Sequence, residues 1–350
     1  MSLKQWMVSS SSPPSVLLMD GGVSTHLESL LQAKNQKFAH RSMWSSSLLL
    51  TEEGREIILQ GHKDWLEAGS DILTTLTYQC HYGVVGQEMV VSQSQMTQLL
   101  KWGVQLARTA IDEEQKFVVA SSGCYGAALA DGSEYTGNYR NIDHLGLVQF
   151  HRKKIQTLLE QHPDGLAIET IPCLTECTAV CDVLSELQPI YSASAFWISL
   201  ACQNGSLLNE GQTLLDALQV LREKDPNADY VHAIGINCCD IAHIASLLEI
   251  LTHDIATNGP TRAIAVYPNS GEEWDAAQEV WREGTGCTNC DQFTKHMMHA
   301  MGVIEQTWKK SSDSPLPKLI LGGCCRTSPE SIATLRRSID DWEKRRKECT

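Results

Sequence analysis

The sequence lacks the features that direct a chain to a membrane or to nucleic acid. No apolar run approaches the roughly 20 residues that a membrane-spanning helix requires. Lys and Arg number 28 against 42 Asp and Glu, so the formal net charge is −14. An acidic surface repels a phosphate backbone, which excludes nucleic acid as an expected partner. Residues 1–14 contain no apolar block and do not predict a secretory signal, but their serines and Pro13-Pro14 predict a flexible N-terminal tail.

Common nucleotide-binding and metal-binding motifs are also missing. The chain has no P-loop, no G-x-G-x-x-G and, among twelve histidines, no H-E-x-x-H. His296 and His299 are three residues apart on a predicted helix, and we expect them at the surface. The C-x-x-C of Cys287 and Cys290 has no second C-x-x-C to complete a four-sulfur site, so it predicts a loop with incidental thiols.

Cysteine is abundant instead. Thirteen cysteines cannot all pair within the chain, and 350 residues with 42% hydrophobic content can bury a large core without disulfides. We therefore expect a reducing, cytoplasmic location, where cysteines serve as core residues, metal ligands or catalytic groups. Cys173, Cys177 and Cys181 have helical i, i+4, i+8 spacing, which predicts a packing stripe.

Short apolar runs alternate with segments of helical periodicity along the whole chain. The predicted strands are Val16–Asp20, Ile72–Thr77, Phe117–Ser121, Gly165–Glu169, Phe196–Ala201, Val231–Asn237, Arg262–Tyr267 and Lys318–Gly322. The clearest helices are Glu52–Ala68, Gln95–Glu114, Ile142–Glu160, Leu174–Leu187, Thr213–Arg222, Ile241–Leu251, Gln292–Trp308 and Pro329–Lys347, the last with Ser328 as its N-cap. Eight strands, each followed by a helix, predict a single-domain (β/α)8 TIM barrel over residues 15–350, with a doubly wound open sheet as the alternative.

Polar groups and thiols follow several of the predicted strands. In a closed barrel the carboxyl ends of the strands meet at one mouth, so these residues would share a site. The groups are Asp20-Gly21-Gly22, Thr74 to Gln79, Glu169-Thr170, Asn237-Cys238-Cys239 and Gly322 to Arg326.

The adjacent Cys324 and Cys325 carry the sharpest signal. Vicinal cysteines strain a mutual disulfide, whereas two thiolates at a bent strand end can reach one ion. Cys238 or Cys239 could supply a third sulfur. Three sulfurs leave one tetrahedral position open, which is typical of catalytic zinc. The alternative is that all four are small buried core residues.

Asp20 and Glu169 allow two interpretations. A lone acid at a strand end often caps a neighbouring helix. Two acids that converge on one mouth could hold a substrate ammonium by charge-assisted hydrogen bonds, or they could form a general acid/base pair.

These residues coincide with a known pattern: the chain resembles the homocysteine S-methyltransferases, zinc enzymes that share a barrel with betaine–homocysteine methyltransferase and with the homocysteine module of methionine synthase. The matching stretches follow the family order and span nearly the whole chain. They are Asp20-Gly21-Gly22, Ala68-Gly69-Ser70-Asp71, Thr75-Leu76-Thr77-Tyr78-Gln79, Glu169-Thr170-Ile171-Pro172, Gly235-Ile236-Asn237-Cys238, Tyr267-Pro268-Asn269-Ser270-Gly271-Glu272 and Gly322-Gly323-Cys324-Cys325-Arg326-Thr327.

The resemblance implies a role for each matching residue. Cys238, Cys324 and Cys325 are the implied Zn²⁺ ligands and catalytic groups, and Cys239 is not a ligand. The implied substrate-binding residues are Asp20 and Glu169 for the amino group of homocysteine, Gly21, Thr75 and Thr77 for its carboxylate, and Asn237 beside the first ligand.

The resemblance also bears on the methyl donor. Tyr135-Thr136-Gly137 and Arg326-Thr327 are similar to the branch that uses S-methylmethionine; S-adenosylmethionine and betaine are the alternatives. The chain lacks the C-terminal extension by which the betaine enzymes associate, which predicts a monomer with small-molecule substrates. A non-catalytic zinc- or thiol-binding redox sensor is the alternative outside the enzymes. The acid pair argues against it, because a sensor needs no amino-acid pocket.

Overall fold

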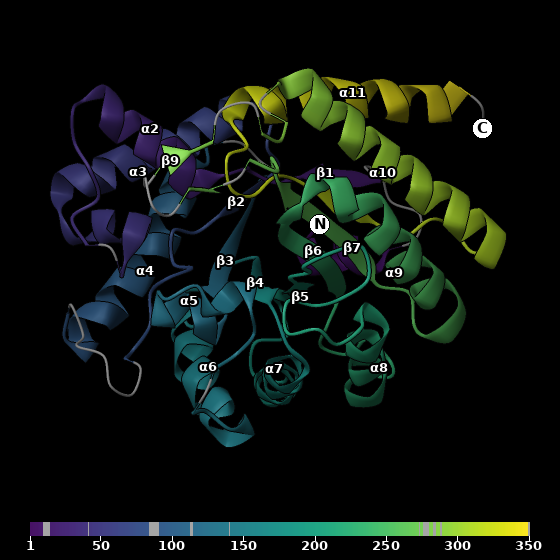
Figure 1. Ribbon diagram of the computed structural model, residues 1–350, viewed down its shortest axis with the longest axis horizontal. Helices are drawn as coiled ribbons and strands as arrows, with labels where there is room; N and C mark the ends of the chain where they lie inside the picture. Colours follow the sequence, from purple (N-terminus) through teal and green to yellow (C-terminus); the bar gives the residue numbers. More distant parts are fainter. Residues whose placement is uncertain are drawn as a thin grey trace.

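The protein forms a closed barrel of eight parallel strands surrounded by helices (Figure 1). The computed structural model describes residues 1–9, 15–40, 42–83, 91–112, 115–139, 141–272, 274–275, 280–282, 285–287 and 289–348. The strands are β1 (Val16–Leu18), β2 (Ile72–Thr74), β3 (Phe117–Gly123), β4 (Gly165–Ile171), β5 (Ala195–Leu200), β6 (Ala233–Asp240), β7 (Ala263–Asn269) and β10 (Leu319–Leu321).

The order of the strands confirms the predicted barrel and excludes the open-sheet alternative. The strands pair in the order β1-β10-β7-β6-β5-β4-β3-β2. The two ends of this order meet through a parallel bridge between Met19 and Ile72, and the backbone N–H of Asp20 donates to the carbonyl of Ile72 at 3.1 Å. Closure removes the sheet edges and brings all the carboxyl ends to one mouth.

A helix lies in each of the eight regions where periodicity predicts one. These helices are α3 (Glu52–Glu67), α4 (Gln93–Ala110), α6 (His144–Leu159), α7 (Leu174–Leu187), α8 (Leu214–Lys224), α9 (Ile244–Asn258), α10 (Cys290–Ser311) and α11 (Pro329–Glu348). The predicted cap of the last helix is confirmed, because Ser328 Oγ accepts from the backbone N–H of Ser331 at 3.4 Å. The predicted helix Ile241–Leu251 begins as a short 3-10 helix, η3 (Ile241–His243), before α9. Several shorter elements were not predicted: α2 (Val23–Ala33), α5 (Tyr125–Leu129), η1 (Trp44–Leu50), η2 (Ser133–Tyr135) and the antiparallel pair β8 (Trp274–Asp275) and β9 (Val280–Trp281).

The prediction of a flexible tail over residues 1–14 is wrong for its first part. Helix α1 (Leu3–Val8) begins with a capping box from Ser2 and buries Leu3, Trp6 and Met7. The side chain of Leu3 packs over Gly165, the first residue of β4, so α1 lies at the amino ends of the strands, opposite the mouth. A helix of six residues, fewer than two turns, is too short to show a period in the sequence. Residues 10–14 lie outside the described residues.

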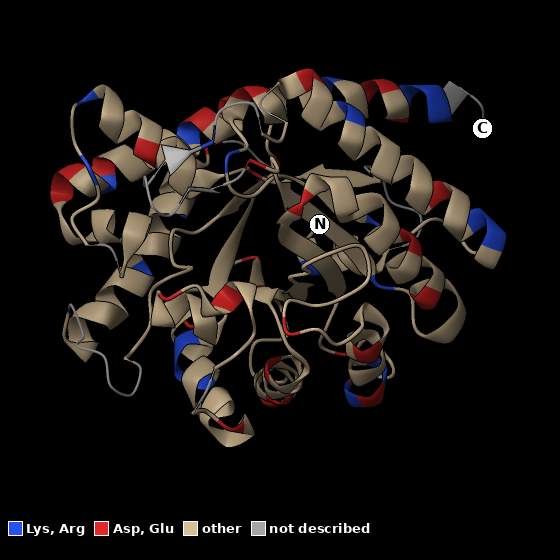
Figure 2. Cartoon of the chain, in the orientation of Figure 1, with Lys and Arg blue, Asp and Glu red and all other residues tan. Residues whose placement is uncertain are grey.

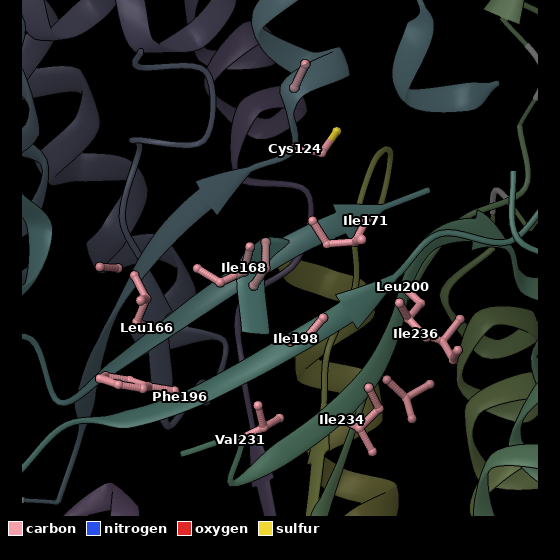
Figure 3. Close-up of a cluster of buried hydrophobic side chains, with 14 of the residues drawn as sticks. Cys124, Leu166, Ile168, Ile171, Phe196, Ile198, Leu200, Val231, Ile234 and Ile236 are labelled. Carbon is pink, nitrogen blue, oxygen red and sulfur yellow. The ribbon is translucent and has the colours of Figure 1, made fainter. Parts of the chain in front are cut away.

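The hydrophobic core has two layers because strand side chains alternate. Leu166 and Ile168 of β4 face the helices, beside Phe196 and Ile198 of β5 (Figure 3). Ala167 faces the barrel interior, together with Trp6 and other α1 residues. The same two-residue period directs Glu169 inward.

The charged side chains lie mostly on the helices and loops, while the strands carry almost none (Figure 2). No helix among the described residues has the length and apolarity to cross a membrane.

Candidate metal centre and acidic pocket

Three cysteines from two distant parts of the chain meet at the mouth of the barrel. The Sγ atoms of Cys238, near the end of β6, and of Cys324 and Cys325, after β10, all lie within 4.8 Å of one another. The Sγ atoms of Cys238 and Cys324 are 2.8 Å apart. Within the described ranges this is the one group of three or more His, Cys, Asp or Glu side chains with metal-binding spacing. Of the two cysteines considered at the end of the sixth strand, Cys238 belongs to this group, whereas Cys239 packs in the outer hydrophobic core.

Local backbone irregularity aims Cys238 at the other two thiols. The pairing of β6 with β7 shifts register between Asn237 and Asp240, and Cys238 has a φ of 51°. A bulge of this kind turns a side chain away from the regular alternation of a strand. A left-handed backbone conformation at a residue other than glycine is costly and concentrates at functional sites.

The end of β7 holds the Cys324–Cys325 pair in place. The backbone N–H of Cys324 donates to the carbonyl of Pro268 at 2.8 Å, and that of Cys325 donates to Oδ1 of Asn269 at 3.1 Å. The carbonyl of Cys325 accepts from the backbone N–H of Ser270 at 3.1 Å. These bonds explain why the Tyr267–Glu272 stretch belongs to the site although it supplies no thiol.

An ion pair that the sequence analysis left without a role adjoins this cluster. Arg326 donates from Nε and Nη2 to the two carboxylate oxygens of Glu272, at 2.9 and 3.0 Å. Ser270 Oγ donates to the same carboxylate at 2.9 Å, and only 7% of the Glu272 side chain is exposed. Arg326 has a φ of 65°. The two-pronged pair ties the loop after β7 to the turn that carries Cys325.

The three thiols are electrostatically coupled. Hydrogen bonds from Cys238 and Cys324 lower the pKa of Cys325 well below its usual value, whereas hydrogen bonding to the other two thiols and burial raise the pKa of Cys238. The hydrogen bonds from Cys238 and Cys324 therefore stabilise the thiolate form of Cys325. A divalent cation among the sulfurs would favour the thiolate form of all three.

Two buried carboxyl groups form an acidic pocket at the same mouth. Asp20 is fully buried, and its carboxylate accepts from the backbone N–H of Thr74 at 2.6 Å and from Thr74 Oγ1 at 3.0 Å. Burial raises the pKa of Asp20 to about 7, and the charge of Glu169 contributes to the rise. Burial also raises the pKa of Glu169 to about 7.

The Glu169 carboxylate has unused hydrogen-bonding capacity. Its Oε1 atom is buried and has no protein partner. An unpaired buried acceptor is costly, so the pocket favours a ligand that brings a positive charge with N–H donors.

Thr75 and Thr77 use their hydroxyls within the protein. The backbone N–H of Ser121 donates to Thr75 Oγ1 at 3.0 Å, and Thr77 Oγ1 donates to the carbonyl of Ser121 at 2.7 Å. The two threonine hydroxyls are 2.6 Å apart. Because Thr77 has given its proton to the carbonyl, Thr75 is the donor in that bond. The pair therefore joins the end of β2 to β3.

Asn237 likewise links two strands. Its Oδ1 accepts from the backbone N–H of Thr170 at 2.9 Å, and its Nδ2 donates to Thr170 Oγ1 at 2.9 Å. Thr170 has a φ of 63°. Asn237 thus stabilises the irregular end of β4 next to Glu169.

Gly21 cannot carry a side chain in this fold. A Cβ atom there would lie 2.7 Å from Thr327 Oγ1 and 2.8 Å from the ring of Trp65. The adjacent Gly22 donates its N–H to Thr327 Oγ1 at 2.8 Å as α2 begins. The start of α2 is thereby held against the turn that carries the cysteine pair.

Other sequence motifs lie apart from the site. Cys173, Cys177 and Cys181 are buried, as the packing stripe predicts, and His296 and His299 are exposed. Cys287 and Cys290 are half-buried and do not belong to the metal-spaced group; Thr288 between them lies outside the described residues.

Sequence reasoning missed the residues that support the acids. Thr74 was visible only as one of several threonines at a strand end. Lys154 is 2% exposed on α6, where Ile155 and Leu158 are also buried. A lysine inside an apolar helical face is a signal that periodicity analysis can find.

Comparison with known sequences gives a consistent result. A family model described as "Homocysteine S-methyltransferase" matches residues 17–339. Homocysteine S-methyltransferase YbgG of Bacillus subtilis is 34% identical over 329 residues, which cover 91% of this chain and 92% of that protein. Homocysteine S-methyltransferase 1 of Arabidopsis thaliana is 32% identical, covering 92% of this chain and 93% of the relative. A selenocysteine Se-methyltransferase of Brassica oleracea is also 32% identical, with 92% and 88% covered.

Comparison with solved structures agrees. The metallated form of the homocysteine methyltransferase MmuM from Escherichia coli superimposes with a TM-score of 0.69 at 28% identity. The match covers 93% of this chain and 96% of that one.

Proposed function

The chain belongs to the homocysteine S-methyltransferase family, and on that premise we propose a zinc-dependent methyltransferase that converts homocysteine to methionine with a sulfonium compound, S-methylmethionine, as donor. The observation that carries this proposal is the meeting of three thiols with two buried acids at one barrel mouth.

Cys238, Cys324 and Cys325 are the proposed zinc ligands. The three Sγ atoms lie within 4.8 Å of one another, close enough for all three to hold one ion, and thiolate sulfur is a preferred zinc ligand. Zinc held by these three cysteines would supply Lewis-acid chemistry that favours the thiolate form of homocysteine. The three cysteine thiolates would add negative charge around that sulfur, so that it stays nucleophilic.

Asp20 and Glu169 are proposed to bind the ammonium of homocysteine. Both carboxyls are buried, and one oxygen of Glu169 has no partner in the protein. An ammonium would supply N–H donors and positive charge together. This role is favoured over a general acid/base pair, because a thiol that has lost its proton to metal coordination needs no separate base.

The remaining site residues are proposed to shape the pocket wall. Gly21 lets the start of α2 approach closely, where the substrate carboxylate would lie. Thr75 and Thr77 set the turn after β2, and Asn237 sets the ends of β4 and β6. Their polar groups are already engaged, so their contribution is to hold the backbone rather than to donate to substrate.

The transfer step needs positioning more than acid–base chemistry. The homocysteine sulfur forms a bond to the donor methyl carbon while the carbon–sulfur bond of the sulfonium breaks. The electron pair stays on the donor sulfur, which leaves as a neutral thioether. An acidic mouth attracts the sulfonium cation, and the fixed pocket aligns the two sulfurs on either side of the methyl group.

We also propose that the barrel of residues 15–350, together with helix α1 at its amino ends, acts as one domain and as a monomer. The three reduced thiols that the site requires fit a reducing compartment such as the cytoplasm. Size-exclusion chromatography with light scattering tests the oligomeric state.

The test of this function replaces one ligand. Cys324→Ser is expected to abolish stoichiometric zinc binding and to reduce methionine formation at least 1,000-fold, since a hydroxyl is a poor zinc ligand. Zinc content by atomic absorption and a methyl-transfer assay with homocysteine and a panel of donors measure both effects. S-methylmethionine, S-adenosylmethionine and betaine form the panel.

Cys290→Ser is the matched control, because Cys290 is also half-buried but lies outside the metal-spaced group. It should leave zinc content and turnover unchanged. Full turnover by Cys324→Ser without zinc would refute the proposal. A wild-type protein that binds zinc but not homocysteine in calorimetry would indicate a redox sensor instead.

A further inference from the structure

A buried lysine on the helix layer reaches toward the mouth of the barrel. Lys154 lies on α6, only 2% exposed, and its Nζ donates to the carbonyl of Tyr78 at 2.8 Å. The same carbonyl accepts from the backbone N–H of Gly123 at 3.2 Å. Tyr78 follows β2, and Gly123 is the last residue of β3, where it pairs in register with Glu169 of β4. The Lys154 ammonium is therefore bound at the strand ends next to the position that carries Glu169. Lysine is rarely buried to this extent unless an acidic group compensates its charge.

The groups that face Lys154 identify the compensating charge. Burial lowers the pKa of Lys154 to about 8, while Cys80, Cys124 and Glu169 raise it. Burial raises the pKa of Cys80 to about 11 and that of Cys124 well above its usual value, so both thiols are neutral at pH 7. Glu169 is therefore the acid that can balance the lysine.

The groups around Glu169 also indicate that Lys154 is its counter-ion. Asp20 faces it from the segment after β1, Tyr267 from β7 and Cys324 from the turn after β10, and none of these is a cation. Lys154 supplies the positive charge that lowers the pKa of Glu169, alongside hydrogen bonds from Ser121 and Tyr267.

Charge counting shows what the lysine adds. When both are ionised, Asp20 and Glu169 contribute two negative charges, and a substrate ammonium contributes one positive charge. Lys154 provides the fourth charge that makes the loaded pocket neutral. Without it, one buried carboxylate would lack a counter-ion, and a buried charge without a partner is strongly unfavourable.

We propose that Lys154 is a positioning residue for substrate recognition: it acts from behind the barrel wall as the buried counter-ion of Glu169, so that the acid pair can accept the ammonium of an amino-acid substrate. This inference rests on the proposed function. It assigns a role in binding the amino group alone, and none in zinc binding or methyl transfer.

The test compares two ligands that differ by one amino group. L-homocysteine carries the ammonium, and 4-mercaptobutanoate is the same thiol acid without it. Isothermal titration of the zinc-loaded protein at pH 7 should show that Lys154→Met binds L-homocysteine about tenfold more weakly. Binding of 4-mercaptobutanoate should change less than twofold. The homocysteine defect should shrink at pH 9, because both carboxyls are ionised there and the wild-type Lys154, with a pKa of about 8, has itself largely lost its charge.

Two further variants separate charge from structure. Lys154→Gln retains a donor for the Tyr78 carbonyl but no charge, and it should behave as Lys154→Met does. Lys153→Met removes the neighbouring lysine of α6, which donates to Gln93 at the surface, and it should bind both ligands as wild type does. Zinc content and the urea midpoint of each variant verify that it is folded.

Three outcomes would overturn the inference. Wild-type binding by Lys154→Gln would show that the hydrogen bond matters and the charge does not. Equal losses for the two ligands would show a general distortion of the pocket. A zinc-loaded wild-type protein that binds neither ligand would overturn the proposed function and this inference with it.

Discussion

At the scale of single residues, the site concentrates conformations and charges that cost stability. Thr170, Cys238 and Arg326 adopt positive φ angles of 63°, 51° and 65°, and all three adjoin the mouth of the barrel. Asp20 and Glu169 are buried acids with raised pKa values. Positive φ angles and buried acids lower stability, so a core selected for stability alone would not contain them. Their concentration at the barrel mouth therefore indicates a functional site.

The buried acids make stability depend on pH in a definite direction. The pKa of Glu169 is about 7 in the folded protein against 4.5 as its ordinary value. Between these pH values the folded state binds more protons than the unfolded state, so the unfolding free energy falls as pH rises from about 4.5 to 7. The acid thus destabilises the ligand-free protein most at pH 8 and least near pH 4.5.

Replacing Glu169 with a neutral residue should raise the stability of the protein and weaken its binding of homocysteine. As the pH rises from 5 to 8, the unfolding free energy of the metal-free Glu169→Gln variant should increase by about 1–3 kcal/mol relative to that of the wild type. Urea unfolding at both pH values measures this difference. The same substitution should also weaken homocysteine binding by the zinc-loaded protein at least tenfold, because a neutral amide cannot balance an ammonium. Glu160→Gln, at an exposed site after α6, should change neither quantity. A Glu169→Gln variant whose stability followed the wild-type pH profile would contradict the assigned charge state.

At the scale of elements, the two ends of the strands have different tasks. The carboxyl ends are irregular and carry polar groups, whereas helix α1 closes the amino ends with apolar side chains. This division is the ordinary arrangement of a barrel enzyme. It implies that stability and chemistry can be altered separately.

A substitution in α1 tests that separation. Trp6→Ala removes a side chain that is 2% exposed and should lower the unfolding free energy by about 3–5 kcal/mol, through lost burial and the cavity it leaves. Val8→Ala, at a position 64% exposed on the same helix, should change it by less than about 0.5 kcal/mol. Urea unfolding measures both variants. Zinc content of the folded Trp6→Ala protein should match wild type, and a loss of zinc would show that α1 and the mouth are coupled.

At the scale of the whole molecule, the three thiols connect strands that are far apart in sequence. Cys238 belongs to β6, and the Cys324–Cys325 pair follows β10; in the sheet, β7 lies between these two strands. A metal held by all three thiols would therefore bridge three consecutive strands of the barrel. Any ligand that binds only the folded state stabilises it by mass action.

Metal removal should accordingly lower the stability of the whole barrel. At free zinc 100-fold above the dissociation constant, the wild-type unfolding free energy should exceed that of the chelated protein by about 2.7 kcal/mol. Thermal unfolding with zinc and with a chelator measures the difference. Cys238→Ser should show a much smaller difference, because it breaks the bridge to β6. A chelator effect of equal size in both proteins would place the stabilising metal elsewhere.

Local pattern was enough to predict the eight strands, the eight main helices and the barrel. Continuous apolar runs and helical periodicity are properties of neighbouring residues, and eight βα units have few ways to bury them. The strand-end residues also predicted that Cys324 and Cys325 would lie near a cysteine of the sixth strand. They left Cys238 and Cys239 as alternatives, and only the resemblance to the family distinguished between the two.

Very short helices and contacts between residues far apart in the sequence could be identified only from the tertiary structure. Helix α1 is too brief to show a period, and it is stabilised by the barrel floor rather than by its own turns. The alignment of Lys154 with Glu169, the Asn237–Thr170 bridge and the Arg326–Glu272 pair join residues between 15 and 67 positions apart. These partners meet only when the barrel closes. Their interactions depend on distance in space, and they therefore produce no periodic pattern in the sequence from which they could be predicted.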